Sequence, residues 1–336
     1  MSQSTPLYHF LTLTHQNNPD DFANGIIAGL SAAEKYIDNK YMYNAVGSDL
    51  FEQITQDPGY YPTHAETEIL RTYATDIIAH VANGTALVEL GAGSAAKTRY
   101  LLEALLQRQN TTLFCPIDIS GEFLQDTVKR LSVDYPTLQM LGIIGDYYSG
   151  LSALAERITQ SKLLIWLGSD LGHTDRNSAA VLLQEKISPA LQIGDKLLLG
   201  IDLKKAIEPL HRAYGCNDDV SNELRYRFNC NALHHINQQL GGNFVTTQFT
   251  RECFYNAEAG RVEIYLKSLC VQQVTLASLK RTFEFSVGER VRIHYAHKYD
   301  QEDILYLAKT AGMRLLHQWF DHNHFYSLNL FALETN

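Results

Sequence analysis

The chain has 336 residues, of which 45% are hydrophobic and 19% are charged, and its formal net charge is −9. This composition is that of a globular chain with a sizeable core, long enough for one large domain or two. The sequence has no run of lysine and arginine, so no nucleic-acid partner is expected. No apolar run approaches the roughly 20 residues that a membrane span needs, so no membrane contact is expected.

The five cysteines are scattered along the chain and form no Cys-x-x-Cys pair. Their spacing predicts neither a zinc site nor a disulfide framework, and we expect buried free thiols in a cytoplasmic protein. Residues 1–6 lack the charged and apolar regions of a signal peptide, which agrees with that location.

The first part of the chain carries helical signals. Apolar residues recur at helical spacing over residues 22–38, and Ser48 is predicted to cap a short helix. Thr63, with Glu66 three residues later, has the pattern of a capping box. This pattern predicts a helix that continues to about Ala82.

Between residues 87 and 203, short apolar runs alternate with helical patterns. Strands are predicted at 86–90, 112–117, 140–144, 162–167 and 196–201, and helices near 97–107, 121–132, 149–158 and 176–189. Such alternation predicts an α/β fold with a parallel, doubly wound sheet. Ligands of these sheets bind at the carboxyl ends of the strands, so the functional residues are expected there.

The pattern changes after residue 204. One helical stretch is predicted at His211–Gln239, followed by alternating runs at 261–267, 281–285 and 291–296 that are typical of an antiparallel sheet. A helix at 300–311 and strands at 314–320 and 325–333 then complete the chain. We interpret the middle segment as a second, smaller α+β region.

The segment Leu87–Thr98 reads as a strand, a Gly-x-Gly turn and a helix start. Gly91 and Gly93 allow a ligand to approach the backbone closely, and the helix start offers unpaired N–H groups. Three acidic residues lie in or after the strands: Glu89 in the first strand, and Asp118 and Asp146 at the ends of later strands. This series is the pattern of S-adenosylmethionine-dependent methyltransferases, whereas a nicotinamide site would prefer a third glycine. The candidate cofactor-binding residues are Glu89, Gly91, Gly93, Ser94, Lys97, Asp118, Asp146 and Tyr147.

Six segments together resemble the histidine-specific N-methyltransferases of ergothioneine biosynthesis. They are residues 43–55, 60–66, 87–98, 167–172, 198–203 and 228–237, and the similarity extends from about residue 20 to the end. The resemblance implies a class I methyltransferase core with a Rossmann-like doubly wound sheet (62–203 plus 300–336). It also implies a substrate-binding α+β domain (1–61 plus 204–299), S-adenosylmethionine as cofactor and S-adenosylhomocysteine as product.

The resemblance places substrate-holding tyrosines at Tyr43, Tyr60 and Tyr214. Three positions depart from the family's pattern. The asparagine that holds the amino-acid end of the substrate is His173 here, and the glutamate and serine that hold the imidazole are His294 and Ala296. A site built around hydrogen bonds loses about 10⁴-fold in specificity when the partners are missing.

We therefore expect an N-methyltransferase that acts on the amino group of a free amino acid or related small amine other than histidine. Tyr43 and His173 are the candidate catalytic residues, and no metal is expected. Two alternatives stay open: histidine held differently by His294, and an inactive cofactor-binding relative that acts as a regulator. The protein is expected to be a monomer or a weak homo-oligomer.

Overall fold

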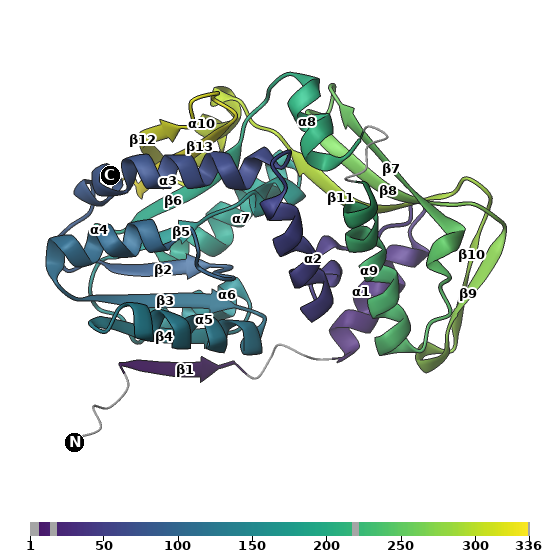
Figure 1. The fold of residues 1–336 in the computed structure, drawn as a ribbon, viewed down its shortest axis with the longest axis horizontal. Helices are drawn as coiled ribbons and strands as arrows, with labels where there is room; N and C mark the ends of the chain where they lie inside the picture. Colours follow the sequence, from purple (N-terminus) through teal and green to yellow (C-terminus); the bar gives the residue numbers. More distant parts are fainter. Residues whose placement is uncertain (1–6, 14–18, 217–221, 335–336) are drawn as a thin grey trace.

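The computed structural model describes residues 7–13, 19–216 and 222–334. An eight-stranded sheet in the order β1-β4-β3-β2-β5-β6-β13-β12 forms the centre of the larger region (Figure 1). Its strands are β1 (Tyr8–Thr12), β2 (Ala86–Leu90), β3 (Thr112–Asp118), β4 (Leu138–Ile144), β5 (Lys162–Trp166), β6 (Lys196–Asp202), β12 (Met313–Phe320) and β13 (Tyr326–Leu333). Pairing from β1 to β6 is parallel, whereas β13 is antiparallel to both of its neighbours. The predicted doubly wound α/β sheet is confirmed.

Helices cover both faces of this sheet, which is why all five residues of β2 are buried. One face packs against α3 (Tyr61–Ala79), α4 (Arg99–Gln109) and α5 (Gly121–Asp134). The other face packs against α6 (Tyr147–Ala155), α7 (Arg176–Leu182) and α10 (Gln301–Thr310). A π-helical segment, η3 (Leu183–Ile187), and a short 3-10 helix, η4 (Ser188–Ala190), follow α7. The carboxyl ends of the parallel strands carry the candidate residues, and they face the second part of the chain (Figure 1).

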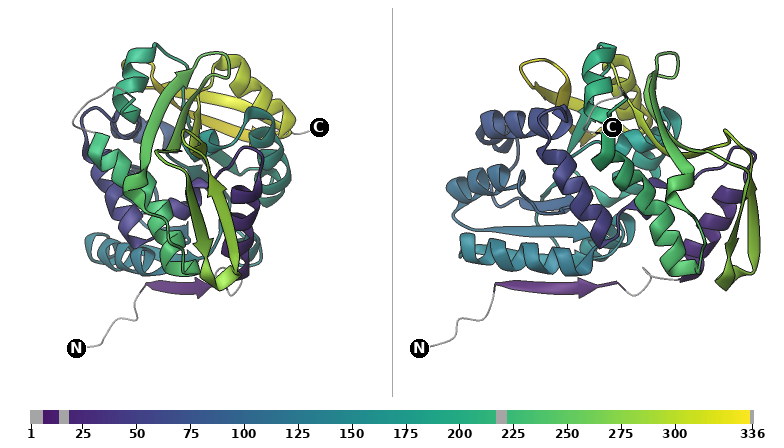
Figure 2. Two further views of the ribbon diagram at one scale, coloured as in Figure 1. Left: turned by 90° about the vertical axis from the view of Figure 1, so that its right-hand side faces the viewer. Right: turned by 45° about the vertical axis from the view of Figure 1, so that its right-hand side comes forward.

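The second region lies beyond those strand ends. It contains α1 (Pro19–Ser31), η1 (Asn39–Met42), α2 (Ala45–Gln56), α8 (Ile207–Tyr214), α9 (Asn222–Leu240), η5 (Thr246–Gln248) and η6 (Ala277–Leu279). An antiparallel sheet of β11 (Arg290–His297), β8 (Arg261–Ser268) and β7 (Phe249–Asn256) packs with these helices, and β9 (Gln272–Leu276) pairs with β10 (Arg281–Phe285). Figure 2 shows the β9–β10 hairpin reaching away from the core sheet.

Two predicted helix starts were wrong. Asn44 caps α2, because its side chain accepts a hydrogen bond from the backbone N–H of Gly47. Ser48 lies inside that helix. Helix α3 begins at Tyr61 without a side-chain cap, so the capping box of Thr63 and Glu66 does not form. Glu66 instead pairs with Lys97 and accepts hydrogen bonds from the N–H of Gly168 and the hydroxyl of Tyr326.

Three long-range features also differ from the expectations. Strand β1 pairs with β4, so residues 8–12 belong to the core sheet and not to the second region. The helical stretch after residue 211 is broken at Gly215, whose φ of +61° ends α8. Cys216 and Cys253 form a disulfide, while Cys115, Cys230 and Cys270 stay free, so the expectation of free thiols throughout was wrong.

In the part of the chain that the structure describes, no helix is both long enough and apolar enough to span a bilayer.

Candidate active site

The glycine loop follows β2 directly and lies at the carboxyl edge of the sheet. Gly91 and Gly93 have φ values of +70° and +49°, a region that favours glycine. A Cβ on Gly91 would lie 2.5 Å from the Tyr147 hydroxyl, whereas nothing lies within 4 Å of a Cβ position on Gly93. The open side of the loop can therefore receive a ligand close to the backbone.

Asp118 ends β3 beside this loop. Its carboxylate accepts hydrogen bonds from the backbone N–H groups of Gly93 (3.0 Å) and Ser120 (2.9 Å). Burial raises the pKa of Asp118, and these N–H groups counteract the rise. The fixed carboxylate is well suited to accept from two neighbouring hydroxyls of a ribose.

Glu89 lies under the loop and is 3% exposed. Thr98 donates to its Oε1 (2.6 Å), while Oε2 is buried without a hydrogen-bond partner in the described structure. Burial raises the pKa of Glu89 to about 8, so the group carries a proton at neutral pH most of the time. The unpartnered oxygen and the open loop fit a ligand that has polar atoms, and S-adenosylmethionine is such a ligand.

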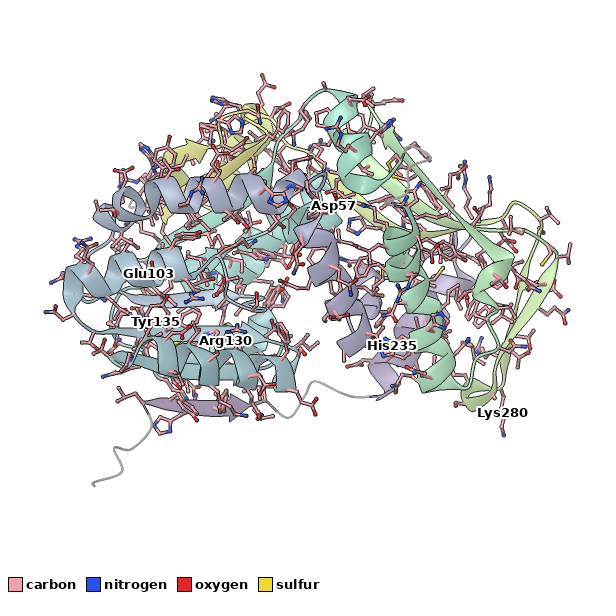
Figure 3. The ribbon with its side chains drawn as sticks, in the orientation of Figure 1. Asp57, Glu103, Arg130, Tyr135, His235 and Lys280 are labelled. Atoms are coloured by element: carbon pink, nitrogen blue, oxygen red, sulfur yellow. A yellow bond between two sulfur atoms is a disulfide. The ribbon has the colours of Figure 1, made fainter. Side chains whose placement is uncertain are left out.

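The other predicted cofactor residues have partners within the protein. Asp146 caps α6 by accepting from the N–H groups of Tyr148 and Ser149, and the Lys97 ammonium pairs with Glu66. The backbone carbonyl of Ser94 accepts from Arg130, which Figure 3 labels on the α5 face of the core. Tyr147 donates to Asp170 (3.1 Å). These contacts fix the loop and the adjoining helices; a direct contact of these residues with the cofactor stays a prediction.

We expect Asp118→Ala to weaken binding of S-adenosylhomocysteine by roughly 10- to 100-fold, because ribose hydroxyls lose a charged acceptor. Isothermal titration calorimetry measures this directly. Asp126→Asn is the control, because Asp126 lies on the exposed surface of α5 with a side chain 80% exposed. Equal affinity of the Asp118→Ala protein and the unmodified protein would remove Asp118 from the cofactor site.

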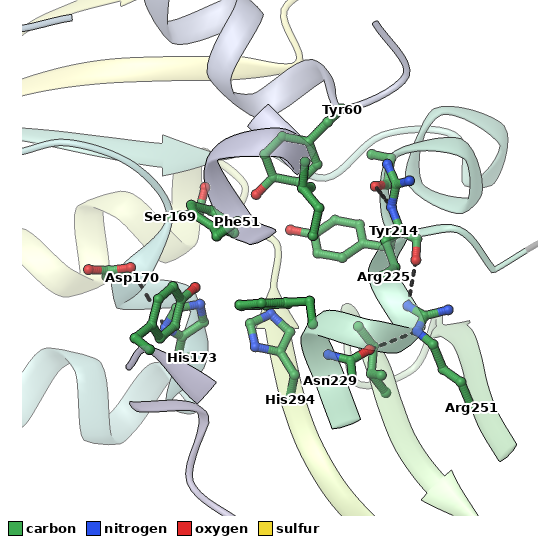
Figure 4. A pocket seen from close by; sticks show the side chains of 15 residues that line it. Phe51, Tyr60, Ser169, Asp170, His173, Tyr214, Arg225, Asn229, Arg251 and His294 are labelled. Atoms are coloured by element: carbon green, nitrogen blue, oxygen red, sulfur yellow. Dashed lines mark hydrogen bonds and ion pairs between the residues drawn. The ribbon is translucent and has the colours of Figure 1, made fainter. Parts of the chain in front are cut away.

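A cavity with about 590 Å³ of empty space, partly open to solvent, lies between the core sheet and the second region (Figure 4). Its lining combines aromatic rings with polar and charged side chains. Its lining residues are Tyr43, Phe51, Ile54, Tyr60, Ser169, Asp170, His173, Ala213, Tyr214, Arg225, Phe228, Asn229, Arg251, Ile264 and His294. All of the predicted substrate residues except Ala296 line this cavity. Ala296 is 3% exposed and packs in the apolar cluster around Tyr214.

The Tyr214 hydroxyl is oriented by a buried ion pair. Lys298, which is fully buried, donates to the Tyr214 oxygen (2.9 Å) and contacts Asp202 Oδ2 (2.8 Å). Burial raises the pKa of Tyr214 well above its usual value. Because the oxygen accepts from Lys298, the phenolic proton is available to a substrate acceptor in the cavity.

His173 and His294 lie side by side in the cavity, with ring centroids 4.6 Å apart. The Asn39 amide donates to Nδ1 of His173 (2.7 Å), so the ring proton of His173 is on Nε2. His294 Nδ1 is buried without a hydrogen-bond partner in the described structure. Burial lowers the pKa of both rings, and it lowers that of His294 to well below the usual value. Both side chains are neutral at pH 7.

Several lining residues were not found from the sequence. Asp170 contributes a carboxylate, and Arg251 donates to the backbone oxygens of Tyr214 and Gly215 and to Asn229. Arg225 pairs with Asp57, which Figure 3 labels at the junction of the two regions. Only Asp170 had a local signal, since it follows β5 at the carboxyl edge of the sheet.

His297 predicts a pH dependence of stability. It is 3% exposed, its Nδ1–H donates to the Gly172 carbonyl (2.9 Å), and burial lowers its pKa to about 4. The unfolded chain, with a histidine pKa of about 6.5, binds this proton more readily, so stability falls as pH drops from about 6.5 to 4. Between pH 7 and 4.5, the free energy of unfolding measured with urea should fall by about 2 kcal/mol more in the unmodified protein than in His297→Gln. Equal losses in both proteins would contradict this.

Comparison with known proteins gives a consistent picture. A profile of the family described as histidine-specific, SAM-dependent methyltransferases matches residues 22–333. The chain is 35% identical over 294 residues to a histidine N-alpha-methyltransferase of Mycolicibacterium smegmatis, covering 88% of this chain and 89% of that protein. It is 30% identical to a 4-dimethylallyltryptophan N-methyltransferase of Arthroderma benhamiae, covering 87% of each.

A solved structure of an S-adenosylmethionine-dependent methyltransferase from Clostridium acetobutylicum aligns with 85% of this chain and 99% of that chain, at 14% identity and a TM-score of 0.46. The family profile, by contrast, spans almost the whole chain and includes the glycine loop and the cavity. The chain belongs to the histidine-specific, S-adenosylmethionine-dependent methyltransferase family, and it is a methyltransferase that uses this cofactor.

Proposed function

We propose that the enzyme methylates the amino group of a free amino acid or related small amine, and that its preferred substrate is not histidine. The observation that carries this proposal is the cavity beside the glycine loop, which combines tyrosine hydroxyls with neutral histidines. Both relatives described above are named as N-methyltransferases of an amino acid or of an amino-acid derivative.

The cofactor, when bound, supplies a methyl group already activated on a sulfonium. What remains for the protein is to hold, orient and desolvate the amine. Gly91, Gly93 and Asp118 would hold the cofactor at the carboxyl edge of the sheet. The Tyr214 hydroxyl, which accepts from Lys298, would donate to the carboxylate of an amino acid.

The side-chain end of the cavity argues against histidine. The resembling family holds the imidazole with a glutamate and a serine, and these positions are His294 and Ala296. Neutral His294 provides a ring nitrogen, which is a weaker acceptor for an imidazole N–H than a charged carboxylate. Ala296 is buried outside the cavity lining, so only the difference at position 294 bears on the substrate side chain. An acidic, aromatic or hydroxylated side chain suits this end better than an imidazole.

Histidine remains the second candidate substrate, because the Mycolicibacterium relative is named for it. In that case His294 would hold the imidazole through its unpartnered Nδ1. An inactive, regulatory role does not agree with membership of the methyltransferase family or with the ligand-site geometry of the glycine loop and Asp118.

The test uses S-adenosylmethionine with a deuterated methyl group and a panel of the common amino acids, with products read by mass spectrometry. We expect one amino acid other than histidine to gain the label, and fragmentation to place it on the amine nitrogen. Asp118→Ala, run in parallel, should give little labelled product. Label on a carboxylate or side-chain oxygen, or on no amino acid, would contradict the proposal.

We also propose that the enzyme works as a monomer or a weak homo-oligomer. The cavity is lined by side chains from both regions of this chain, among them Tyr43, Asp170 and His294. Light scattering at assay concentrations tests this, and a stable tetramer would contradict it.

A further inference from the structure

The substrate amine needs a partner at the cofactor end of the cavity. At neutral pH an amine is largely an ammonium, which has no lone pair for attack on a methyl group. The group that binds it must therefore accept a proton, and it must lie between the glycine loop and the cavity. This inference rests on the proposed function, because it concerns the amine that is methylated.

Asp170 occupies that position. It begins η2 (Asp170–His173), which follows β5 after a loop of three residues, and it lines the cavity. Its Oδ2 accepts a hydrogen bond from the Tyr147 hydroxyl (3.1 Å). The same hydroxyl packs against Gly91 of the glycine loop. Its Oδ1 is 3.8 Å from Nδ1 of His173. Figure 4 shows Asp170 on the side of the cavity opposite Arg251. The carboxylate thus connects the cofactor loop with the substrate cavity.

The other polar groups that line the cavity are poor proton acceptors. Burial raises the pKa of Tyr43 and Tyr60, so both phenols keep their protons. His173 accepts from Asn39 at Nδ1 and carries a proton on Nε2, which leaves no lone pair for the amine. Burial lowers the pKa of His294, so it binds a proton weakly. Tyr43 and His173, the candidate catalytic residues, are therefore poor proton acceptors, and Asp170 is the one carboxylate among the lining residues.

We propose that Asp170 is a catalytic residue that binds the substrate ammonium and accepts its proton. In this step the N–H bond breaks, its electron pair stays on nitrogen as the lone pair, and the proton forms an O–H bond with the carboxylate. The proton then passes to water, because the Asp170 side chain is 43% exposed. The groups that face Asp170 are Tyr43, Tyr60, Asp118, Tyr147 and His173. None of these groups is a cation, so none of them competes with an ammonium for the Asp170 carboxylate.

The first test measures binding without turnover. Calorimetry in the presence of S-adenosylhomocysteine compares three pairs that differ by the amine: L-histidine and imidazolepropionate, L-tyrosine and phloretate, and L-glutamate and glutarate. The unmodified protein should bind at least one amino acid on the order of tenfold or more tightly than its partner without the amine. Asp170→Asn should lose this preference but keep its affinity for S-adenosylhomocysteine.

The second test uses pH and a matched control. Because asparagine cannot accept a proton, the turnover deficit of Asp170→Asn should shrink as the pH rises from about 7 to about 9.5 and the amine deprotonates in solution. Asp126→Asn, an exposed aspartate on α5, should behave as the unmodified protein does. A merely structural role of Asp170 would give a deficit that does not change with pH.

The outcomes separate two failures. If the unmodified protein methylates an amino acid while Asp170→Asn keeps the amine preference, the role of Asp170 is overturned and the proposed function stands. If it methylates none of the amino acids, the proposed function fails and this inference fails with it.

Discussion

Replacing Asp202 by asparagine is expected to lower the free energy of unfolding by about 3 to 5 kcal/mol. Asp202 ends β6, is 2% exposed, and accepts from the Tyr61 hydroxyl (2.7 Å) and from Lys298 and Lys205. Both ammonium groups are buried, with side-chain exposures of 0% and 3%. Burial alone would raise the pKa of Asp202, but the two lysines hold it below its usual value. Without the carboxylate charge, two buried cations lose their counterion.

Urea unfolding at pH 7 measures this loss. Asp126→Asn removes a carboxylate of the same size from an exposed pair with Lys129, and it should change the free energy of unfolding by less than about 0.5 kcal/mol. The Asp202→Asn protein should also bind substrate weakly, because Lys298 no longer holds the Tyr214 hydroxyl in place. A loss of stability below about 1 kcal/mol would show that the buried lysines are neutral or solvated.

The second large effect concerns specificity. His294→Glu should raise kcat/KM for histidine relative to the best other amino acid by on the order of 100-fold, because a hydrogen bond to a charged group is worth about 1.5 to 3 kcal/mol. The new carboxylate would lie near His173, Lys298 and Arg251, which already interact electrostatically with His294. The positive charges of Lys298 and Arg251 would favour the ionised form of the glutamate. It could then accept from an imidazole N–H.

The control for this change is His294→Gln, which provides an acceptor of the same length without charge and should shift the preference less. Adding Ala296→Ser should contribute little, because Ala296 lies in the apolar cluster with Val262 and Ile264 and outside the cavity lining. An unchanged ratio for histidine in His294→Glu would mean that position 294 does not contact the substrate side chain.

The core of the fold could be predicted because its signals are local. The segment Leu87–Thr98 contains the signals of a strand, a turn and a helix start within a dozen residues. The neighbouring strands are apolar because they are buried on both faces. Asp118 could be placed for the same reason, since the end of one parallel strand lies beside the end of the next.

The features that could not be predicted depend on distant contacts. Cys216 and Cys253 are 37 residues apart and meet only because α8 packs against β7. Glu66 has the spacing of a capping box, but its carboxylate binds Lys97 and the N–H of Gly168, which are distant in sequence. Arg251 lines the cavity only because β7 brings it beside Tyr214 and Asn229 of other segments.

The central claim is that this methyltransferase accepts an amino acid other than histidine at its amine. The most direct measurement offers the unmodified enzyme histidine and the other common amino acids together at equal concentrations, with limiting S-adenosylmethionine, and quantifies each N-methylated product. In such a competition, product ratios report the ratios of kcat/KM. We expect an amino acid with an acidic, aromatic or hydroxylated side chain to give the dominant product and histidine to give at most about one part in a hundred. N-methylated histidine as the main product would contradict this account of the cavity.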